Sequence, residues 1–95
     1  MKVINVKGTS NLTCPCNKWI EHWRNFSGQI ANECRVEGCS EKKVVGAHVQ
    51  KVYSDDKEMY IAPVCKEHNK SELPYELNKY TKLVLADPEK TCQKP

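Results

Sequence analysis

The clearest hydrophobic pattern in the chain lies between Asn17 and Phe26. Apolar side chains stand at positions 19, 20, 23 and 26, which is the spacing of a helix that buries one face. Asn17 is a favourable N-cap residue, and Gly28 suits the left-handed conformation in which many helices end. We therefore predict an N-terminal amphipathic helix, and we expect Trp19, Trp23 and Phe26 to form much of the core.

Two segments typical of β-strands follow this helix. The segment Lys43–Tyr53 is rich in β-branched residues and partly alternates, and Met59–Ala62 is a second short apolar run. The polar residues Ser54–Lys57 between them favour a turn. The pattern predicts an antiparallel hairpin that Pro63 closes, because proline cannot donate a hydrogen bond to a sheet.

The remaining sequence predicts a helix, a late strand and a tail. Val64–Lys70 opens a helix, which Pro74 interrupts. Lys82–Ala86 is a candidate strand, and we expect the polar segment Asp87–Pro95 to fray. The sequence contains no internal repeat and no segment of clearly different composition. The pattern therefore indicates one α+β domain over residues 1–95.

Length and composition limit what this domain can be. With 39% hydrophobic residues and only seven aromatic side chains, 95 residues bury a small core, so a metal or covalent cross-link is plausible. The net charge of +3 is smaller than that of a dedicated nucleic-acid binder. Neither a spanning apolar segment nor a secretory signal is found in the sequence. We expect a monomeric, cytoplasmic protein that does not contact membranes.

The cysteines favour metal binding, because a reducing compartment keeps thiols free. Cys34 and Cys39 enclose a turn that contains Gly38, while Cys65 and His68 are one helical turn apart. Three thiolates and one imidazole suit Zn²⁺ and leave no position open for water, so we predict one structural zinc site. Disulfides and buried cysteines without a ligand remain the alternatives.

The other cysteines are harder to assign. Cys14 and Cys16 are separated by a single proline, which is shorter than the usual spacing of zinc ligands. They could be turn or core cysteines, a redox dithiol, or part of a second zinc site together with His22 or His48. Cys92 lies in the tail and has no evident partner in the sequence.

The order of these motifs resembles treble-clef zinc proteins and, among them, the zinc-bearing HNH endonucleases (the ββα-metal group). The resemblance covers about residues 34–72, and its motifs are Cys34-x4-Cys39, the strand residues 46–49 and the helix start at 63–69. It implies a small treble-clef-like domain with a knuckle, a hairpin and a helix. The tryptophan-rich helix is also similar to that of small uncharacterised bacterial zinc-binding proteins.

The resemblance also implies catalytic roles. A histidine on the first hairpin strand is the general base of HNH enzymes, which His48 would match, and Asn69 would support the catalytic metal. The chain departs from the pattern at Ala47, where many HNH sequences carry an Asp or His ligand, and His68 would already bind the structural zinc. The site therefore resembles a degenerate one, and His48 could instead be a strand histidine or an extra zinc ligand.

The function predicted from the sequence is a non-catalytic zinc module that binds nucleic acid or protein. The alternative is an HNH-like metal-dependent DNA endonuclease with His48 as general base. Candidate contacts to nucleic acid are the scattered lysines and the tyrosines: Lys42, Lys43, Lys51, Lys66, Lys70, Lys79 and Lys82, with Tyr53, Tyr60, Tyr75 and Tyr80.

Overall fold

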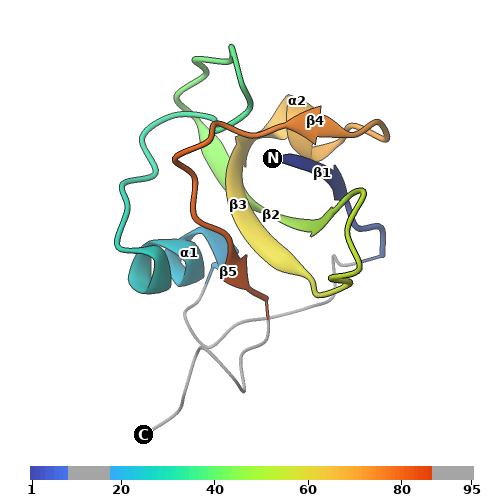
Figure 1. The fold of residues 1–95 in the computed structure, drawn as a ribbon. Helices are drawn as coiled ribbons and strands as arrows, with labels where there is room; N and C mark the ends of the chain where they lie inside the picture. Colours follow the sequence, from blue (N-terminus) through green and yellow to red (C-terminus); the bar gives the residue numbers. More distant parts are fainter. Residues whose placement is uncertain (9–17, 87–95) are drawn as a thin grey trace, which may run out of the picture.

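The computed structural model describes residues 1–8 and 18–86. Within these ranges the chain forms an α+β fold with one antiparallel five-stranded sheet, in the strand order β4-β1-β2-β3-β5, and two helices (Figure 1). The elements, in chain order, are β1 (Lys2–Asn5), α1 (Trp19–Ser27), β2 (Val44–Lys51), β3 (Tyr60–Cys65), α2 (Lys66–Asn69), β4 (Tyr75–Glu76) and β5 (Val84–Leu85).

The predicted hairpin is confirmed, since β2 and β3 pair antiparallel from Val44 opposite Cys65 to Val49 opposite Tyr60. The prediction that Pro63 closes the second strand was wrong, because Pro63 lies buried inside β3. Its carbonyl accepts a hydrogen bond from the Arg35 amide on the side away from β2. The amide and carbonyl of a strand residue point to the same side, so the missing N–H removes no bond to β2.

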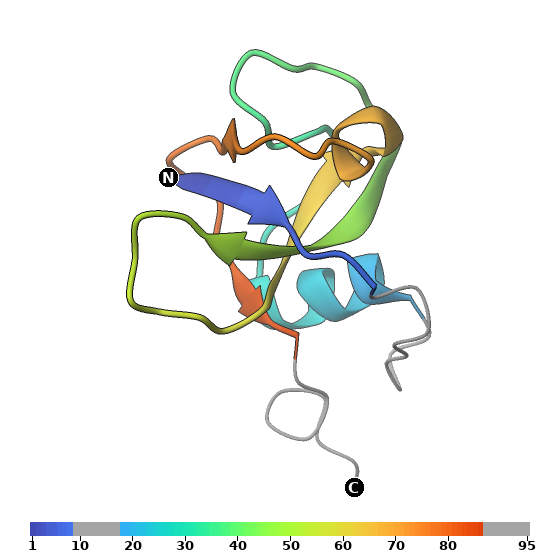
Figure 2. The ribbon, with the colours of Figure 1, turned by 90° about the vertical axis from the view of Figure 1, so that its right-hand side faces the viewer.

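The β2–β3 hairpin separates two clusters of buried side chains. Ala47 and Val49 of β2 pack in the cluster that contains Cys34 and Cys65. Gly46 faces α1, and residues alternate between the faces of a strand, so His48 lies on the same side as Gly46. Figure 2 shows α1 and α2 on opposite sides of the hairpin.

Helix α1 lies one or two residues later than predicted. It begins after Lys18, which makes no side-chain capping bond, while the predicted N-cap Asn17 lies outside the described residues. Gly28 ends the helix with a φ of 71°, as its sequence position indicated. The helix is not the first element, because β1 precedes it.

The core prediction for α1 is right in part. Trp23 is fully buried and donates from Nε1 to the Lys82 carbonyl at 2.7 Å, and Trp19 is half-buried. Phe26 was expected in the core but is 46% exposed. In this short helix, Ile20 and Trp23 make the buried contact with the sheet, and Phe26 instead lies beside the His22 ring.

Strands β1 and β4 were not predicted. Val3 of β1 is fully buried and pairs with Lys51 of β2 on one side and with Tyr75 of β4 on the other. The late strand is shorter than predicted, with only Val84–Leu85 in β5. The predicted tail over 87–95 lies outside the described residues.

Candidate metal centre

Four side chains meet beside the end of the hairpin, and they are the four that the sequence predicts as metal ligands. Cys34 and Cys39 lie in the connection between α1 and β2, Cys65 ends β3, and His68 is in α2. Their ligand atoms all lie within 4.8 Å of one another, so they can hold one metal ion. None of the three cysteines forms a disulfide in the structure.

Tight backbone turns present the first pair of cysteines. The Cys39 amide donates to the Val36 carbonyl at 2.9 Å, and Gly38 between them has a φ of 83°, a conformation that glycine adopts without strain. The Cys34 amide donates to the Glu41 carbonyl at 2.8 Å. These two bonds fold residues 34–41 back on themselves, so both thiols face the same point.

The second pair is placed by the change from strand to helix. Cys65 is the N-cap residue of α2, and His68 follows three positions later, on the same side of the helical turn. The Cys65 Sγ lies 3.1 Å from Nδ1 of His68, and the Cys34 Sγ lies 3.7 Å from the same nitrogen. The imidazole therefore already faces two of the sulfurs.

The Cys34 sulfur sits in a setting that suits a metal-bound thiolate. The Cys65 backbone amide donates to it at 3.2 Å. Burial raises the pKa of the Cys34 thiol to about 12, although amide hydrogen bonds at Val36 and Cys65 act to lower it. The protein alone therefore favours the protonated thiol, and a bound cation would supply the charge that a thiolate needs.

The cluster is buried on one side and open on the other. Cys34 and Cys65 are buried, whereas Cys39 and His68 are partly exposed. A surface hollow of about 420 Å³ adjoins the cluster and is lined by residues that include two of its cysteines: Cys39, Glu41, Lys43, Cys65, Lys66 and Glu67.

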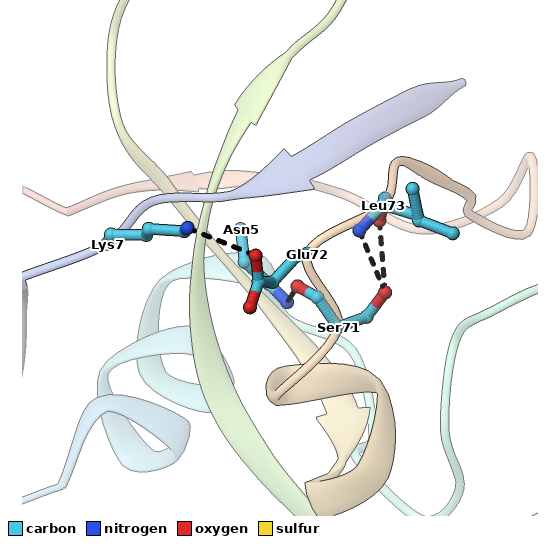
Figure 3. A network of polar contacts seen from close by, with 5 residues as sticks. All are labelled: Asn5, Lys7, Ser71, Glu72 and Leu73. Carbon is cyan, nitrogen blue, oxygen red and sulfur yellow. Dashed lines mark hydrogen bonds and ion pairs between the residues drawn. The ribbon is translucent and has the colours of Figure 1, made fainter.

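Asn5 of β1 holds α2 in place beside the cluster. Its Nδ2 donates to the carbonyls of His68 and Ser71, at 2.8 and 2.9 Å, and its Oδ1 accepts a 2.6 Å hydrogen bond from the Tyr75 hydroxyl. Figure 3 shows the Asn5 side chain beside Ser71, just past the helix, with the Lys7–Glu72 ion pair next to it. The sequence analysis missed this support, because nothing near Asn5 in the chain indicates its distant partners.

The two candidate catalytic residues lie in different surroundings. His48 of β2 is only 7% exposed and packs edge-on against the Trp19 ring, with 4.7 Å between ring centroids. Asn69 is the exposed last residue of α2 and directly follows His68 of the Cys34 cluster. Burial, followed by the nearby His22, lowers the pKa of His48 to about 4.

The other predicted metal ligands are only partly described. Cys14, Cys16 and Cys92 lie outside the described residues. His22 is fully buried in α1, with Nε2 at 2.8 Å from the Leu85 carbonyl oxygen. His22 and His48 both contact the Trp19 ring, and neither belongs to the cluster around Cys34.

Within residues 1–8 and 18–86, no helix has both the length and the apolar character needed to cross a bilayer. No protein-family model, curated protein or solved structure matches the chain.

Proposed function

We propose that the protein is a structural zinc module that binds nucleic acid without catalysing a reaction. The observation that carries this proposal is the set of three sulfurs and one imidazole nitrogen within 4.8 Å of one another. All four tetrahedral positions of Zn²⁺ would be filled by protein ligands, which is the arrangement of a structural site and not of a catalytic one.

The ligand chemistry supports zinc over harder cations. Thiolates and imidazoles are soft or borderline donors, whereas Mg²⁺ and Ca²⁺ take oxygen ligands. The ligands come from a turn, from the last residue of a hairpin and from the helix that follows it. This order of parts supports a treble-clef-like arrangement in which the ion joins the turn to the helix.

A ligand substitution tests the zinc site. We expect Cys65→Ser to lower the zinc content of the purified, reduced protein by at least one equivalent, measured by elemental analysis. Ser40→Ala is the matched control, because Ser40 is exposed and adjacent to Cys39 but not in the cluster. Equal zinc contents in the wild type and in Cys65→Ser would contradict the proposal.

Two exposed tyrosines support nucleic acid as the partner. Tyr53 is 92% exposed, and Tyr80 is 70% exposed with the Lys79 ammonium 5.2 Å from its ring centroid. A base that stacks on an exposed aromatic ring gains roughly 1–3 kcal/mol, and a nearby lysine can contact phosphate. The other two tyrosines are less suitable, because Tyr75 is buried and Tyr60 donates to Asp56.

Binding to single-stranded oligonucleotides tests the partner. We expect an affinity that falls as salt rises from 50 to 200 mM, because phosphate contacts release counterions. Tyr80→Ala and Tyr53→Ala should each weaken binding about 5-fold or more if a base stacks there. Ile30→Ala is the control, since Ile30 is 72% exposed but has no aromatic ring. If the protein does not bind oligonucleotides even at the lowest salt, nucleic acid is excluded as the partner and protein is the partner class that is left.

The nuclease alternative remains a prediction with its own assay. His48 is buried against Trp19 and Asn69 is exposed on α2, so we expect no nicking of plasmid DNA with Mg²⁺ or Mn²⁺. Nicking by the wild type that is lost in His48→Ala would establish the endonuclease in place of the non-catalytic module.

A further inference from the structure

The segment between β4 and β5 carries an exposed aromatic ring with a lysine on each side of it in the chain. Lys79, Tyr80 and Lys82 are all exposed, and the Lys79 ammonium lies 5.2 Å from the Tyr80 ring centroid. Neither residues 78–82 nor residues 28–31, which are hydrogen-bonded to them, include an acidic side chain. Together these two stretches present positive charge and one flat apolar ring to solvent.

The Gln29 side chain joins this segment to the end of α1. Its Nε2 donates to the Tyr80 carbonyl at 2.7 Å, and its Oε1 accepts a hydrogen bond from the Lys82 amide at 3.0 Å. A carboxamide can make both bonds because it carries a donor and an acceptor. The Gln29 amide donates in turn to the Ser27 hydroxyl at 3.0 Å. One side chain thus ties the backbone around Tyr80 to the connection that follows α1, and Figure 1 shows the two stretches next to each other.

Further hydrogen bonds fix the backbone that carries the ring. The Tyr80 amide donates to Oδ1 of Asn78 at 2.8 Å, and the Thr81 amide donates to the Asn78 carbonyl at 3.0 Å. The Lys82 carbonyl accepts a 2.7 Å bond from Nε1 of the buried Trp23. Because this backbone is already ordered, a ligand that stacks on the Tyr80 ring pays less conformational entropy on binding.

An exposed ring of this kind distinguishes between forms of nucleic acid. Purely electrostatic binding follows the density of phosphates, which favours a duplex over a single strand. Stacking requires a base whose face is free, and unpaired bases in a single strand offer such a face. The net charge of +3 makes the electrostatic mode weak for this chain. Stacking on Tyr80 therefore favours a single strand.

We propose that Gln29 is a positioning residue of a single-strand binding site, in which a base stacks on Tyr80 while Lys79 and Lys82 contact the neighbouring phosphates. The inference rests on the nucleic-acid binding proposed above, and it adds where the strand binds and which form of nucleic acid is bound. Gln29 acts on the base only through the backbone that it holds, at the Tyr80 carbonyl and the Lys82 amide.

A double-mutant cycle tests the role of Gln29. Gln29→Met keeps the length of the side chain and removes both of its hydrogen bonds. We expect it to weaken binding of an oligothymidylate of about 12 nucleotides by about 3-fold or more, and to have no further effect in the Tyr80→Ala background. Equal weakening in both backgrounds would overturn the positioning role. Ser71→Ala is the matched control, because it removes two hydrogen bonds between a side chain and the Leu73 backbone and should leave binding unchanged.

Salt dependence separates the roles of the side chains. Lys79→Gln and Lys82→Gln should each lower the slope of log affinity against log salt concentration by about 0.7, which is the loss of one phosphate contact on a single strand. Gln29→Met should leave this slope unchanged, because it removes no charge. A lower slope in Gln29→Met, or an unchanged slope in both lysine variants, would contradict the assignment.

A comparison of three ligands uses the wild type alone, so it holds even if Gln29→Met folds poorly. At one salt concentration, we expect the single strand to bind about 5-fold or more tightly than a duplex of the same length and than an abasic strand of the same length. A duplex or abasic strand that binds as tightly as the single strand would overturn this site and leave nucleic-acid binding in place. Absence of binding to all three would overturn the proposed function as well.

Discussion

At the scale of single residues, the absence of a side chain at Gly46 determines how closely α1 approaches the sheet. A Cβ atom added there would lie 2.6 Å from the backbone of both Trp19 and Ile20, which are backbone contacts that no rotamer change can relieve. Nothing in the sequence indicated this constraint, because a glycine inside a strand has several explanations. Gly46 therefore determines where the Trp19, His22 and His48 rings meet.

This contact makes Gly46→Ala the most informative single substitution on that face. We expect it to lower the free energy of unfolding by about 3 kcal/mol, because a packed helix must shift. Urea unfolding measures the loss, and near-UV circular dichroism should report a changed tryptophan environment. Gly28→Ala is the control: it strains a φ of 71° but has open space around it, so the tryptophan signal should stay the same. An unchanged signal in Gly46→Ala would contradict this role.

At the scale of elements, the position of α1 depends more on Trp23 than on Phe26 at the end of its apolar stripe. Trp23→Phe removes the donor to the Lys82 carbonyl, and we expect it to destabilise the protein by about 1–3 kcal/mol. Phe26→Ser should cost less than about 1 kcal/mol, since Phe26 is 46% exposed. Thermal or urea unfolding of the two variants gives the comparison. A larger loss for Phe26→Ser than for Trp23→Phe would contradict this account of the helix.

The elements that the sequence predicted are those whose signals are local. The hairpin combines alternation with a polar turn, and α1 combines a 3.6-residue period with a glycine stop, so a short window contains each of them. Strands β1 and β4 are held by partners far along the chain, as when Val3 pairs with Tyr75. Pro63 misled the prediction because its effect depends on which side of β3 its nitrogen faces.

The four residues of the candidate metal site were predictable for a different reason. Their residue types are rare and chemically specific, so the spacing of Cys34, Cys39, Cys65 and His68 identified them without any knowledge of the fold. Asn5, which holds α2 beside the cluster, has a common side chain and partners more than sixty residues away. Spacing thus indicates the direct ligands and is silent about the residues that orient them.

At the scale of the whole molecule, stability should depend on bound metal. A structural zinc in small peptides is worth an apparent ~10–16 kcal/mol near neutral pH, while whole domains are stable by ~5–15 kcal/mol. The Cys34 cluster ties residues before β2 to α2, and Cys34 and Cys65 are part of one buried cluster with β1 and β4 side chains. Loss of the ion would therefore destabilise the whole sheet.

Chelation tests this dependence. We expect an excess of chelator at pH 7 to abolish the cooperative thermal transition, followed by far-UV circular dichroism. The reason is that the chelator would remove the ion that joins the turn to α2. Added Zn²⁺ should restore the transition, and added Mg²⁺ should not, since it prefers oxygen ligands. A protein proved metal-free by elemental analysis that still melts at the original temperature would contradict this expectation.

The place of β1 in the sheet has a consequence for how the protein is made. β1 is synthesised before both of its partners, β2, some forty residues later, and β4 near residue 75. Contacts between such distant segments form slowly, because a long stretch of chain must close into a loop before the strands can pair. The β1–β4 edge of the sheet can therefore form only after residue 76 has been synthesised, so Val3 lacks its Tyr75 partner until then.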